Sequence, residues 1–204
     1  MKIELVIATK NKKKLGEIKH ILKGLDLKII ALADFKETPR IIENGSTFKE
    51  NAVKKALKTA RFTKKLCLGE DSGLCVDALK GAPGIYSSRF SGKDKSDPKN
   101  NLKVLKLLEG LPLNKRKAHY TCAVAVADQR GLIGVVEGKC FGVIGFEQKG
   151  SHGFGYDPLF IIPGHKKTFA QLGLKIKHRI SHRFRALEKA RRLLQKYIEQ
   201  YQSG

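Results

Sequence analysis

The first apolar run, over residues 3–8, is short and continuous, which is typical of a buried strand. After a polar turn, apolar residues recur at helical spacing, and Gly24 predicts where that helix stops. These residues are Leu15, Ile18, Leu22 and Leu25. A second strand is predicted over 27–32, so the chain opens as strand, turn, helix and strand.

A capping box predicts the next helix, because Thr47 is followed three residues later by Glu50 and then by an apolar stripe. A short strand over 66–68 then leads directly into Glu70 and Asp71. The Ser-Gly pair after these acids is expected to form a turn before the apolar pattern resumes.

The second half of the chain is richer in strands. Asp97 followed by Pro98 predicts one more helix, with Asp97 as its N-cap and Leu108 near its end. The predicted strands span 120–127, 132–136, 141–146 and 159–162, and an amphipathic helix is predicted from about Ser181. Because helices and strands alternate early and strands gather later, the predicted fold class is α/β with a mixed sheet.

The length of 204 residues suits a single domain over 1–204, and no linker or repeat divides it. No apolar run is long enough to cross a membrane, and Lys2 and Glu4 interrupt the N-terminal apolar stretch. We therefore expect a cytoplasmic protein without a membrane partner. The four cysteines form no C-x-x-C pair, so reduced, buried thiols are expected rather than zinc ligands or disulfides.

The charge balance is strongly basic, with 41 Lys and Arg against 19 Asp and Glu and a formal net charge of +22. Such a charge favours either nucleic-acid binding or the concentration of small anions such as nucleotides near the surface. A Lys-rich surface of a heat-adapted protein is a third explanation, although Glu normally rises with Lys in such proteins. Composition alone leaves the three open.

Against this background the adjacent acids Glu70 and Asp71 are candidates for chemistry. Two solvated loop acids are the common explanation of such a pair. The alternative is a site for a hard cation, because Mg²⁺ prefers one or two carboxylates together with substrate phosphates. Glu43 has no capping role and is a candidate to share a metal with Asp71, whereas Glu50 is expected to cap its helix.

Two lysine-bearing segments are candidates to bind phosphate. The turn over 9–14 places three consecutive lysines at a helix N-terminus, where free amides and the helix dipole attract anions. A solvated basic turn explains this segment equally well, and it is not a Walker loop because the glycines of that motif are missing. Lys55 lies at the edge of an apolar helix face and could reach into a cleft, although a snorkelling lysine has the same pattern.

A compact loop over 153–158 combines two glycines, two aromatic residues and an acid, a combination able to stack on a base and read its edge. A tight turn with packed aromatics is the simpler explanation of the loop taken alone. Lys177, His182 and Arg183 lie before and at the start of the last predicted helix and add potential donors, with a surface histidine as the alternative for His182.

Taken in chain order, these motifs resemble the inosine triphosphatase family, the pyrophosphatases of non-standard purine nucleoside triphosphates. The matching segments are A-T-K-N-K-K-K (8–14), E-N-G-S-T-F-K-E-N-A (43–52), E-D-S-G-L (70–74), G-A-P-G-I-Y (81–86), F-G-Y-D-P (154–158) and S-H-R (181–183). Each motif is short, but the six occur in the family's order and span nearly the whole chain.

The resemblance implies an α/β fold with an elongated central mixed sheet flanked by helices, and two lobes with a deep nucleotide cleft between them. It implies hydrolysis of inosine, deoxyinosine and xanthosine triphosphates (ITP, dITP and XTP) to the monophosphate and pyrophosphate, which removes them from the nucleotide pool. It also implies Mg²⁺ as cofactor and a homodimer. Nucleic-acid binding is expected to be incidental at most, because Glu43 and Asp71 would repel phosphates.

Carried over by position, the resemblance assigns a role to individual residues. The triphosphate would be held by Thr9, Lys10, Asn11, Lys12, Lys13, Lys14 and Lys55. Glu43 and Asp71 would bind the metal, and Asp71 would also accept the proton of the attacking water. The nucleotide pocket would be lined by Ser72, Phe154, Gly155, Tyr156 and Asp157, and the purine contacted by Lys177, His182 and Arg183. Donors aimed at a 6-keto group would reject the 6-amino group of adenine.

Two positions depart from the pattern of bacterial relatives: Lys10 replaces a glycine, and Glu70 replaces the first of two aspartates. Glu70 is one methylene longer, which leaves its share in metal binding open. Two other functions remain as alternatives. One is a related pyrophosphatase with a different base specificity, and the other is a basic nucleic-acid-binding protein, which would show steeply salt-dependent binding.

Overall fold

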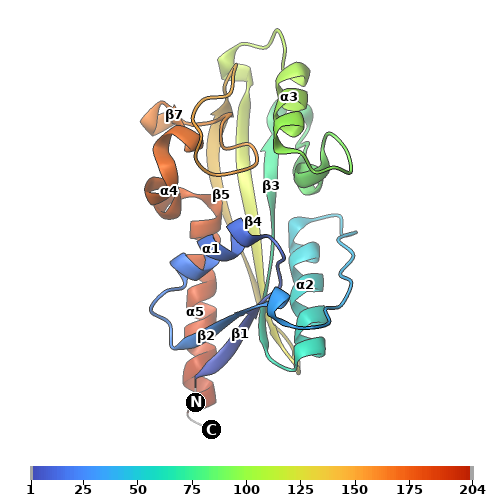
Figure 1. Ribbon diagram of the computed structural model, residues 1–204. Helices are drawn as coiled ribbons and strands as arrows, with labels where there is room; N and C mark the ends of the chain where they lie inside the picture. The colour runs from blue at the N-terminus through green and yellow to red at the C-terminus, as the bar shows by residue number, and fades with distance from the viewer. Residues whose placement is uncertain (1, 203–204) are drawn as a thin grey trace. The chain divides into compact units, whose positions relative to one another are not determined.

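The computed structural model describes residues 2–202 and contains a seven-stranded sheet in the order β2-β1-β3-β4-β5-β6-β7 (Figure 1). The strands are β1 (Ile3–Ile7), β2 (Leu27–Ala31), β3 (Leu66–Val76), β4 (Lys117–Asp128), β5 (Gly131–Ile144), β6 (Phe160–Ile162) and β7 (Lys167–Thr168). The α-helices are α1 (Lys12–Ile21), α2 (Phe48–Thr63), α3 (Asp97–Leu107), α4 (Phe169–Ile180) and α5 (His182–Gln202). The predicted mixed sheet is confirmed, since β1 pairs parallel with β2 and β3, whereas β6 pairs antiparallel with β5 and β7.

The chain separates into two compact units, each with its own hydrophobic core. The first unit comprises the residues up to Asp71, Cys122–Gly138 and the residues from Phe184 onward, and the second comprises Ser72–Thr121 and Lys139–Arg183. Since the boundaries fall inside β3, β4 and β5, each of these strands contributes residues to both units. The first core includes Leu5, Ile18, Leu68, Val124 and Leu187, and the second includes Leu74, Leu108, Ile144, Phe160 and Phe169.

Strands β3 and β5 are longer than their sequence patterns predicted. The Ser-Gly pair after Asp71 continues β3 instead of forming a turn, so both candidate acids lie inside an 11-residue strand. The run predicted over 132–136 and the first four residues of the run predicted over 141–146 belong to one 14-residue strand, β5, which ends at Ile144. Glycine and polar residues interrupt the apolar pattern, but pairing with neighbouring strands keeps the backbone extended through them.

Helix α4 was not predicted, although Thr168 and Gln171 form a capping box at its start. The helix is interrupted at Gly173, whose φ of +75° is non-helical, and this break disturbs the spacing by which a helix is recognised. Lys177 consequently lies in the last turn of α4 and not in a connecting segment.

Helix α3 begins as predicted, but its N-cap is Ser96 and not Asp97. The hydroxyl of Ser96 accepts a hydrogen bond from the amide of Lys99 at 3.4 Å, which is the bond that defines an N-cap. Asp97 is the first residue inside the helix, so its carboxylate is available for another partner.

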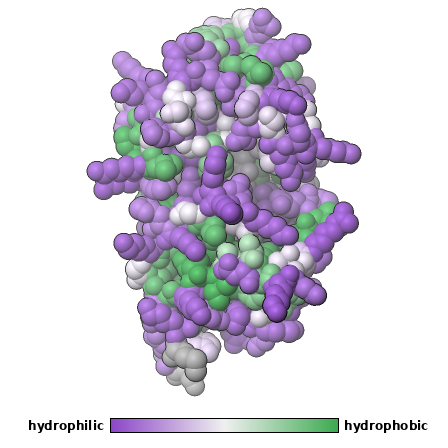
Figure 2. Space-filling view, viewed as in Figure 1, coloured by the Kyte–Doolittle hydropathy of each residue, from purple (hydrophilic) through white to green (hydrophobic). Residues whose placement is uncertain are grey.

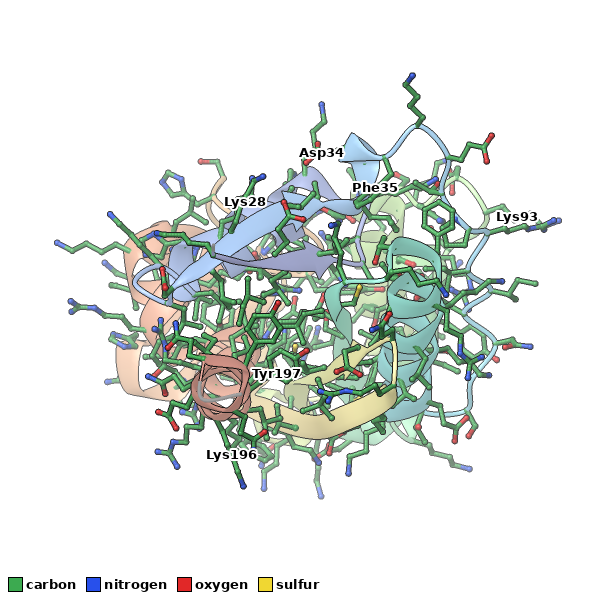
Figure 3. All side chains as sticks on the ribbon, turned by 90° about the horizontal axis from the view of Figure 1, so that it is seen from below. Lys28, Asp34, Phe35, Lys93, Lys196 and Tyr197 are labelled. Carbon is green, nitrogen blue, oxygen red and sulfur yellow. The ribbon has the colours of Figure 1, made fainter. Side chains whose placement is uncertain are left out.

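Polar side chains dominate the face shown in Figure 2, with apolar patches scattered among them. Long cationic side chains such as Lys93 and Lys196 project outward (Figure 3). Among the described helices, none combines the length and the apolar character that a membrane span requires.

The four cysteines carry free thiols, as expected, and three of them are buried: Cys67, Cys122 and Cys140. Burial raises the pKa of Cys67 to about 11, against a smaller effect of its hydrogen bond with Thr63. A thiol with such a pKa is protonated at neutral pH, which is the behaviour of a structural cysteine.

Helix α2 packs unusually closely on β3 at Gly69. A Cβ at this position would lie 2.5 Å from the backbone nitrogen of Ala56 and in collision with the carbonyl oxygen of Ala52. At this contact the helix presents the small residues Ala52 and Ala56, and the strand presents Gly69, which has no side chain. This close approach brings the first half of α2 beside the acids of β3, which are the next residues along the strand.

We expect Gly69→Ala to destabilise the fold by about 1–3 kcal/mol, because the added methyl group must push a helix backbone away from the sheet. The matched control is Gly16→Ala in α1, where an added Cβ would meet nothing within 4 Å. That change should stabilise the chain by about 0.5–1 kcal/mol, since alanine is the better helix former. Urea denaturation measures both, and equal stabilities of the two variants would contradict the close packing.

Candidate active site

The first unit holds a cluster of charges where α2 meets β3, in which Lys55 and Asp71 are buried and Glu43 is exposed. The ammonium of Lys55 donates to Glu43 Oε2 at 2.9 Å and to Asp71 Oδ1 at 3.0 Å. The other oxygen of Asp71 accepts a hydrogen bond from Asn51 Nδ2 at 3.1 Å. Asn51 is itself fixed, because its Oδ1 accepts from the amide of Gly45 at 2.8 Å. Two residues one helical turn apart therefore hold both oxygens of Asp71.

The three charged groups of this cluster shift one another's pKa. Burial raises the pKa of Asp71 above its ordinary value, although Lys55 and Lys14 pull it down. Burial also opposes the charge of Glu43, but the charge and hydrogen bond of Lys55, helped by Lys14, outweigh it and lower the pKa of Glu43. For Lys55, the attraction of Asp71 and Glu43 outweighs burial and raises its pKa. The pKa values of the two carboxylates are thus shifted in opposite directions.

Glu70 lies on the opposite face of β3 from Asp71, because successive strand residues alternate. Its Oε2 forms an ion pair with Lys14 Nζ at 3.0 Å, and its Oε1 accepts a hydrogen bond from the thiol of Cys122 at 3.3 Å. The two acids are only 3% and 7% exposed, which contradicts the alternative of two solvated loop acids. Glu70 is therefore engaged in holding Lys14 beside the cluster.

The turn between β1 and α1 presents lysine side chains more than free amides. Asn11 is the N-cap, and its Oδ1 accepts the amides of Lys13 at 2.9 Å and Lys14 at 3.1 Å, while its own amide donates to Thr9 Oγ1 at 3.2 Å. Two of the amides expected to be free at this helix N-terminus are therefore used by the cap. The side chains of Lys10, Lys12 and Lys13 are exposed. Attraction of an anion to this turn therefore rests mainly on ammonium charge.

Glu43 and Asp71 fit a magnesium ion better than a transition metal. Their oxygens converge on a single cation position, which the ammonium of Lys55 takes in this structure. Within residues 2–202, no three His, Cys, Asp or Glu side chains are grouped so that they could hold a metal. Two carboxylates without further protein ligands suit Mg²⁺, which takes its remaining ligands from water and phosphate.

The second unit gathers most of the predicted base-reading residues into one cluster. Asp157 and Lys177 form an ion pair of 2.6 Å in which both side chains are 2% exposed. The ring of Phe154 lies 4.4 Å from the ammonium of Lys177 and 5.6 Å from the guanidinium of Arg183. Arg183 also donates to Ser72 Oγ at 3.1 Å. An aromatic ring with two cations over it is thus held next to a buried carboxylate.

Two predicted residues of this unit are more deeply buried than their sequence contexts suggested. His182 is 4% exposed and stacks on Tyr120 with ring centroids 4.5 Å apart, so the surface alternative is wrong. The ring of Tyr156 packs in the core, and its hydroxyl donates to the carbonyl of Ser87 at 2.7 Å. Tyr156 therefore cannot stack on a base, and Phe154 is the aromatic residue of the loop that remains accessible.

Sequence reasoning missed three polar residues of these clusters: Asn51, Asp97 and Asn101. Asn51 was hidden inside a capping sequence, although it stands one turn before Lys55 on the same helix face. Asp97 was assigned to the N-cap, and Asn101 was taken as an ordinary helix residue although it is 2% exposed. The available signal was spacing. Asn51 and Lys55 are four residues apart, as are Asp97 and Asn101, and this spacing puts each pair on one side of its helix.

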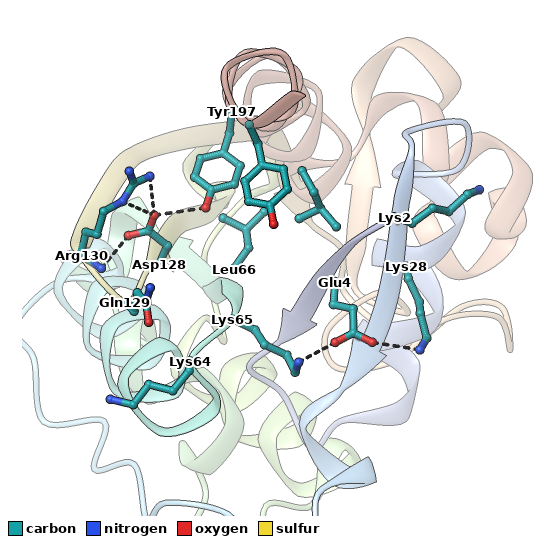
Figure 4. A pocket seen from close by; sticks show the side chains of 12 residues that line it. Lys2, Glu4, Lys28, Lys64, Lys65, Leu66, Asp128, Gln129, Arg130 and Tyr197 are labelled. Carbon is teal, nitrogen blue, oxygen red and sulfur yellow. Dashed lines mark hydrogen bonds and ion pairs between the residues drawn. The ribbon is translucent and has the colours of Figure 1, made fainter. Parts of the chain in front are cut away.

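A cavity of about 700 Å³ in the first unit lies apart from these residues, beside the first residues of β1 and β3 (Figure 4). The two acidic residues that line it, Glu4 and Asp128, already form ion pairs with basic residues of the same lining. Glu4 pairs with Lys28 at 2.9 Å and Lys65 at 2.6 Å, whose hydrogen bonds lower its pKa to about 2. Asp128 pairs with Arg130 at 2.9 Å. Because most of its cations are engaged, this cavity is a weak anion site, and none of the predicted functional residues lines it.

The chain is similar to known proteins along nearly its whole length. The model of the Ham1 family matches residues 5–193. A dITP/XTP pyrophosphatase of Desulforamulus reducens is 49% identical over 199 residues, which cover 97% of this chain and 99% of the relative. The dITP/XTP pyrophosphatase of Shouchella clausii is 46% identical over 184 residues, or 90% and 92% of the two chains.

Solved structures agree with the sequence comparison. A HAM1 protein from Coxiella burnetii matches with a TM-score of 0.87 and 39% identity, over 95% of this chain and 99% of that one. The Staphylococcus aureus Ham1 protein matches with a TM-score of 0.85 and 36% identity, over the same shares. The family resemblance noted from the motifs is confirmed.

Lys55→Met is expected to destabilise the fold by about 3 kcal/mol, because it leaves the buried carboxylate of Asp71 without its cation. Since folding raises the pKa of Lys55, this contribution is complete at neutral pH and is lost only as the pH rises through that raised value. Lys58→Met, an exposed lysine of the same helix, should change stability by less than about 0.5 kcal/mol. Thermal unfolding measures both, and wild-type stability of Lys55→Met would rule out the buried ion pairs.

Proposed function

Because the chain belongs to the Ham1 family, we propose that it hydrolyses ITP, dITP and XTP to the monophosphate and pyrophosphate. The names of the relatives from Desulforamulus reducens and Shouchella clausii support this substrate class. The observation that carries the proposal is the cluster in which the exposed Glu43 and the buried Asp71 both bind the buried Lys55, with Lys14 close enough to lower the pKa of Glu43. These four residues are the candidates for the catalytic base, the metal-binding pair and the cations that bind phosphate.

The proposed reaction is an in-line attack of water on the α-phosphorus. The new bond forms from the water oxygen, the bond to the α–β bridging oxygen breaks, and pyrophosphate leaves with that oxygen. Asp71 accepts the proton of the water, a task that its raised pKa favours over that of an exposed aspartate. Asn51 keeps the carboxylate in one orientation through its hydrogen bond to Oδ2.

Glu43 and Asp71 are the residues that would hold Mg²⁺. When bound, the ion neutralises charge on the phosphate oxygens and lowers the pKa of nearby water. Lys14, Lys55 and the exposed lysines of the turn over 9–14 attract the triphosphate and stabilise its developing charge. Glu70 contributes indirectly, through its ion pair with Lys14.

Base selection is proposed to rest on the second unit. The ring of Phe154 stacks on the purine, Ser72, Gly155 and Asp157 line its surroundings, and the donors of Lys177, His182 and Arg183 face the 6-keto oxygen. These three donors are almost fully buried. When ATP presents an amino group instead, any N–H aimed at the 6-keto oxygen loses that acceptor, and a buried N–H without an acceptor is strongly unfavourable.

Three further features follow from the resemblance and stay predictions. They are the homodimer, the elongated two-lobed form with a nucleotide cleft, and the cytoplasmic location. The TM-scores of the Coxiella burnetii and Staphylococcus aureus proteins support the family fold on which the first two depend.

Pyrophosphate release should be fast with ITP or XTP and slow with ATP, and Asp71→Asn should lower kcat on the order of 10²–10⁴-fold by removing the base. The matched control is Asp26→Asn, an exposed acid of the same unit that pairs with Lys2, and it should keep wild-type activity. Turnover of ITP by Asp71→Asn at the wild-type rate would discard the role of this acid. Absence of turnover with every purine triphosphate would discard the proposed function.

Removal of divalent ions with EDTA should abolish turnover, and Mg²⁺ should restore it. Glu43→Gln should raise the concentration of Mg²⁺ that gives half-maximal activity by on the order of 10-fold, since it removes one charged ligand. Glu37→Gln, at an exposed acid six residues earlier, should not move that concentration. Full activity in EDTA would refute the metal requirement, and an unchanged Mg²⁺ dependence of Glu43→Gln would refute its role as ligand.

A further inference from the structure

The first turn of α3 holds the loop that carries Phe154. Because Ser96 caps the helix, the carboxylate of Asp97 is directed to the amide of Gly155, which donates to Asp97 Oδ2 at 2.7 Å. This is a short, charge-assisted hydrogen bond to a loop 58 residues away in the sequence. A solvated first-turn acid would form no such bond.

The next turn of α3 holds the same residue from its other side. Asn101 Nδ2 donates to the carbonyl of Gly155 at 3.1 Å and to Gln148 Oε1 at 3.0 Å. Asn101 is 2% exposed, so this amide is committed to the loop and not to water. Asp97 and Asn101 are one helical turn apart, and together they bind the N–H and the C=O of one glycine.

The held residue lies directly after the proposed stacking ring. Gly155 has a φ of +63°, a left-handed conformation that favours glycine, and it joins Phe154 to the buried Tyr156. The amide of Phe154 donates to Asp157 Oδ2, the oxygen that also binds Lys177. The position of the Gly155 peptide therefore affects the ring of Phe154 and the ion pair of Asp157 and Lys177 at once.

We propose that Asp97 and Asn101 are positioning residues for base selection, acting through the backbone of Gly155. The inference rests on the proposed function, since it assigns the loop over 153–157 to recognition of the purine. Discrimination between a 6-keto and a 6-amino base requires donors that do not move to suit the wrong base. Two hydrogen bonds from a rigid helix supply that fixity, while the phosphate-binding residues belong to the other unit.

The test compares kcat/KM for ITP and for ATP in Asp97→Ala, Asn101→Ala and the double variant. Each single change should lower kcat/KM for ITP on the order of 10-fold, mainly through a higher KM, and leave the slow reaction of ATP nearly unchanged. The ratio of the two specificity constants should therefore fall. Because both side chains hold one peptide, the double variant should lose less than the product of the two single effects.

Two controls separate positioning from a general loss of stability. Asp97→Asn keeps an acceptor for the amide of Gly155 and should recover most of the ITP preference. Asp94→Ala removes an exposed acid of the preceding segment, which pairs with Lys99, and should leave the ratio at its wild-type value. The melting temperature of each variant shows whether enough folded protein is present, and a ratio of specificity constants is insensitive to an inactive fraction.

A wild-type preference for ITP that survives in both Asp97→Ala and Asn101→Ala would overturn this inference and leave the proposed function intact. A parallel loss of activity toward ITP and ATP would also overturn it, since that is the result of a purely structural role. A wild-type chain that hydrolyses no purine triphosphate would overturn the proposed function first, and the positioning role with it.

Discussion

The first unit depends on one close contact, the seating of α2 on the bare backbone of Gly69. The contact sets how near the helix lies to β3, and so whether Lys55 and Asn51 can reach the side chain of Asp71. A buried carboxylate without these partners would be unfavourable by several kcal/mol and would take up a proton. The small residue in the strand is therefore what makes a charged aspartate sustainable inside the protein.

Because side chains alternate between the two faces of β3, neighbouring residues contact different parts of the protein. Glu70 faces Lys14 and Cys122, whereas Asp71 faces α2, so one acid holds a lysine of the turn over 9–14 and the other is bound by Lys55. Ser72, the next residue, accepts a hydrogen bond from Arg183, which is proposed to contact the base. Three consecutive residues thus bind three different partners, because a strand holds each side chain rigidly and on a fixed face.

Much of the fold followed from local patterns, and much of the site followed from motifs. The strand at 3–8, the helices after Asn11 and Thr47 and the mixed sheet were predictable, because period and caps are local properties. The length of β3 and β5 and the broken helix α4 were not, since sheet pairing and the kink at Gly173 override the local pattern. The motifs identified Asp71, Lys55 and Asp157 as candidates but could not show which side chains they contact. Lys55 and Asp71 are 16 positions apart, and Asp157 and Lys177 are 20 apart, so only the fold brings each pair together.

The chain passes between its two compact units four times, at positions inside β3, β4 and β5 and at the start of α5. Neither unit therefore corresponds to one stretch of the gene. A recombination event between two relatives would place parts of different ancestry inside the same core, and the packing of each core tolerates few mismatches. One recombination event therefore cannot exchange a whole unit between two relatives. Single substitutions, by contrast, leave both cores made from one parent sequence.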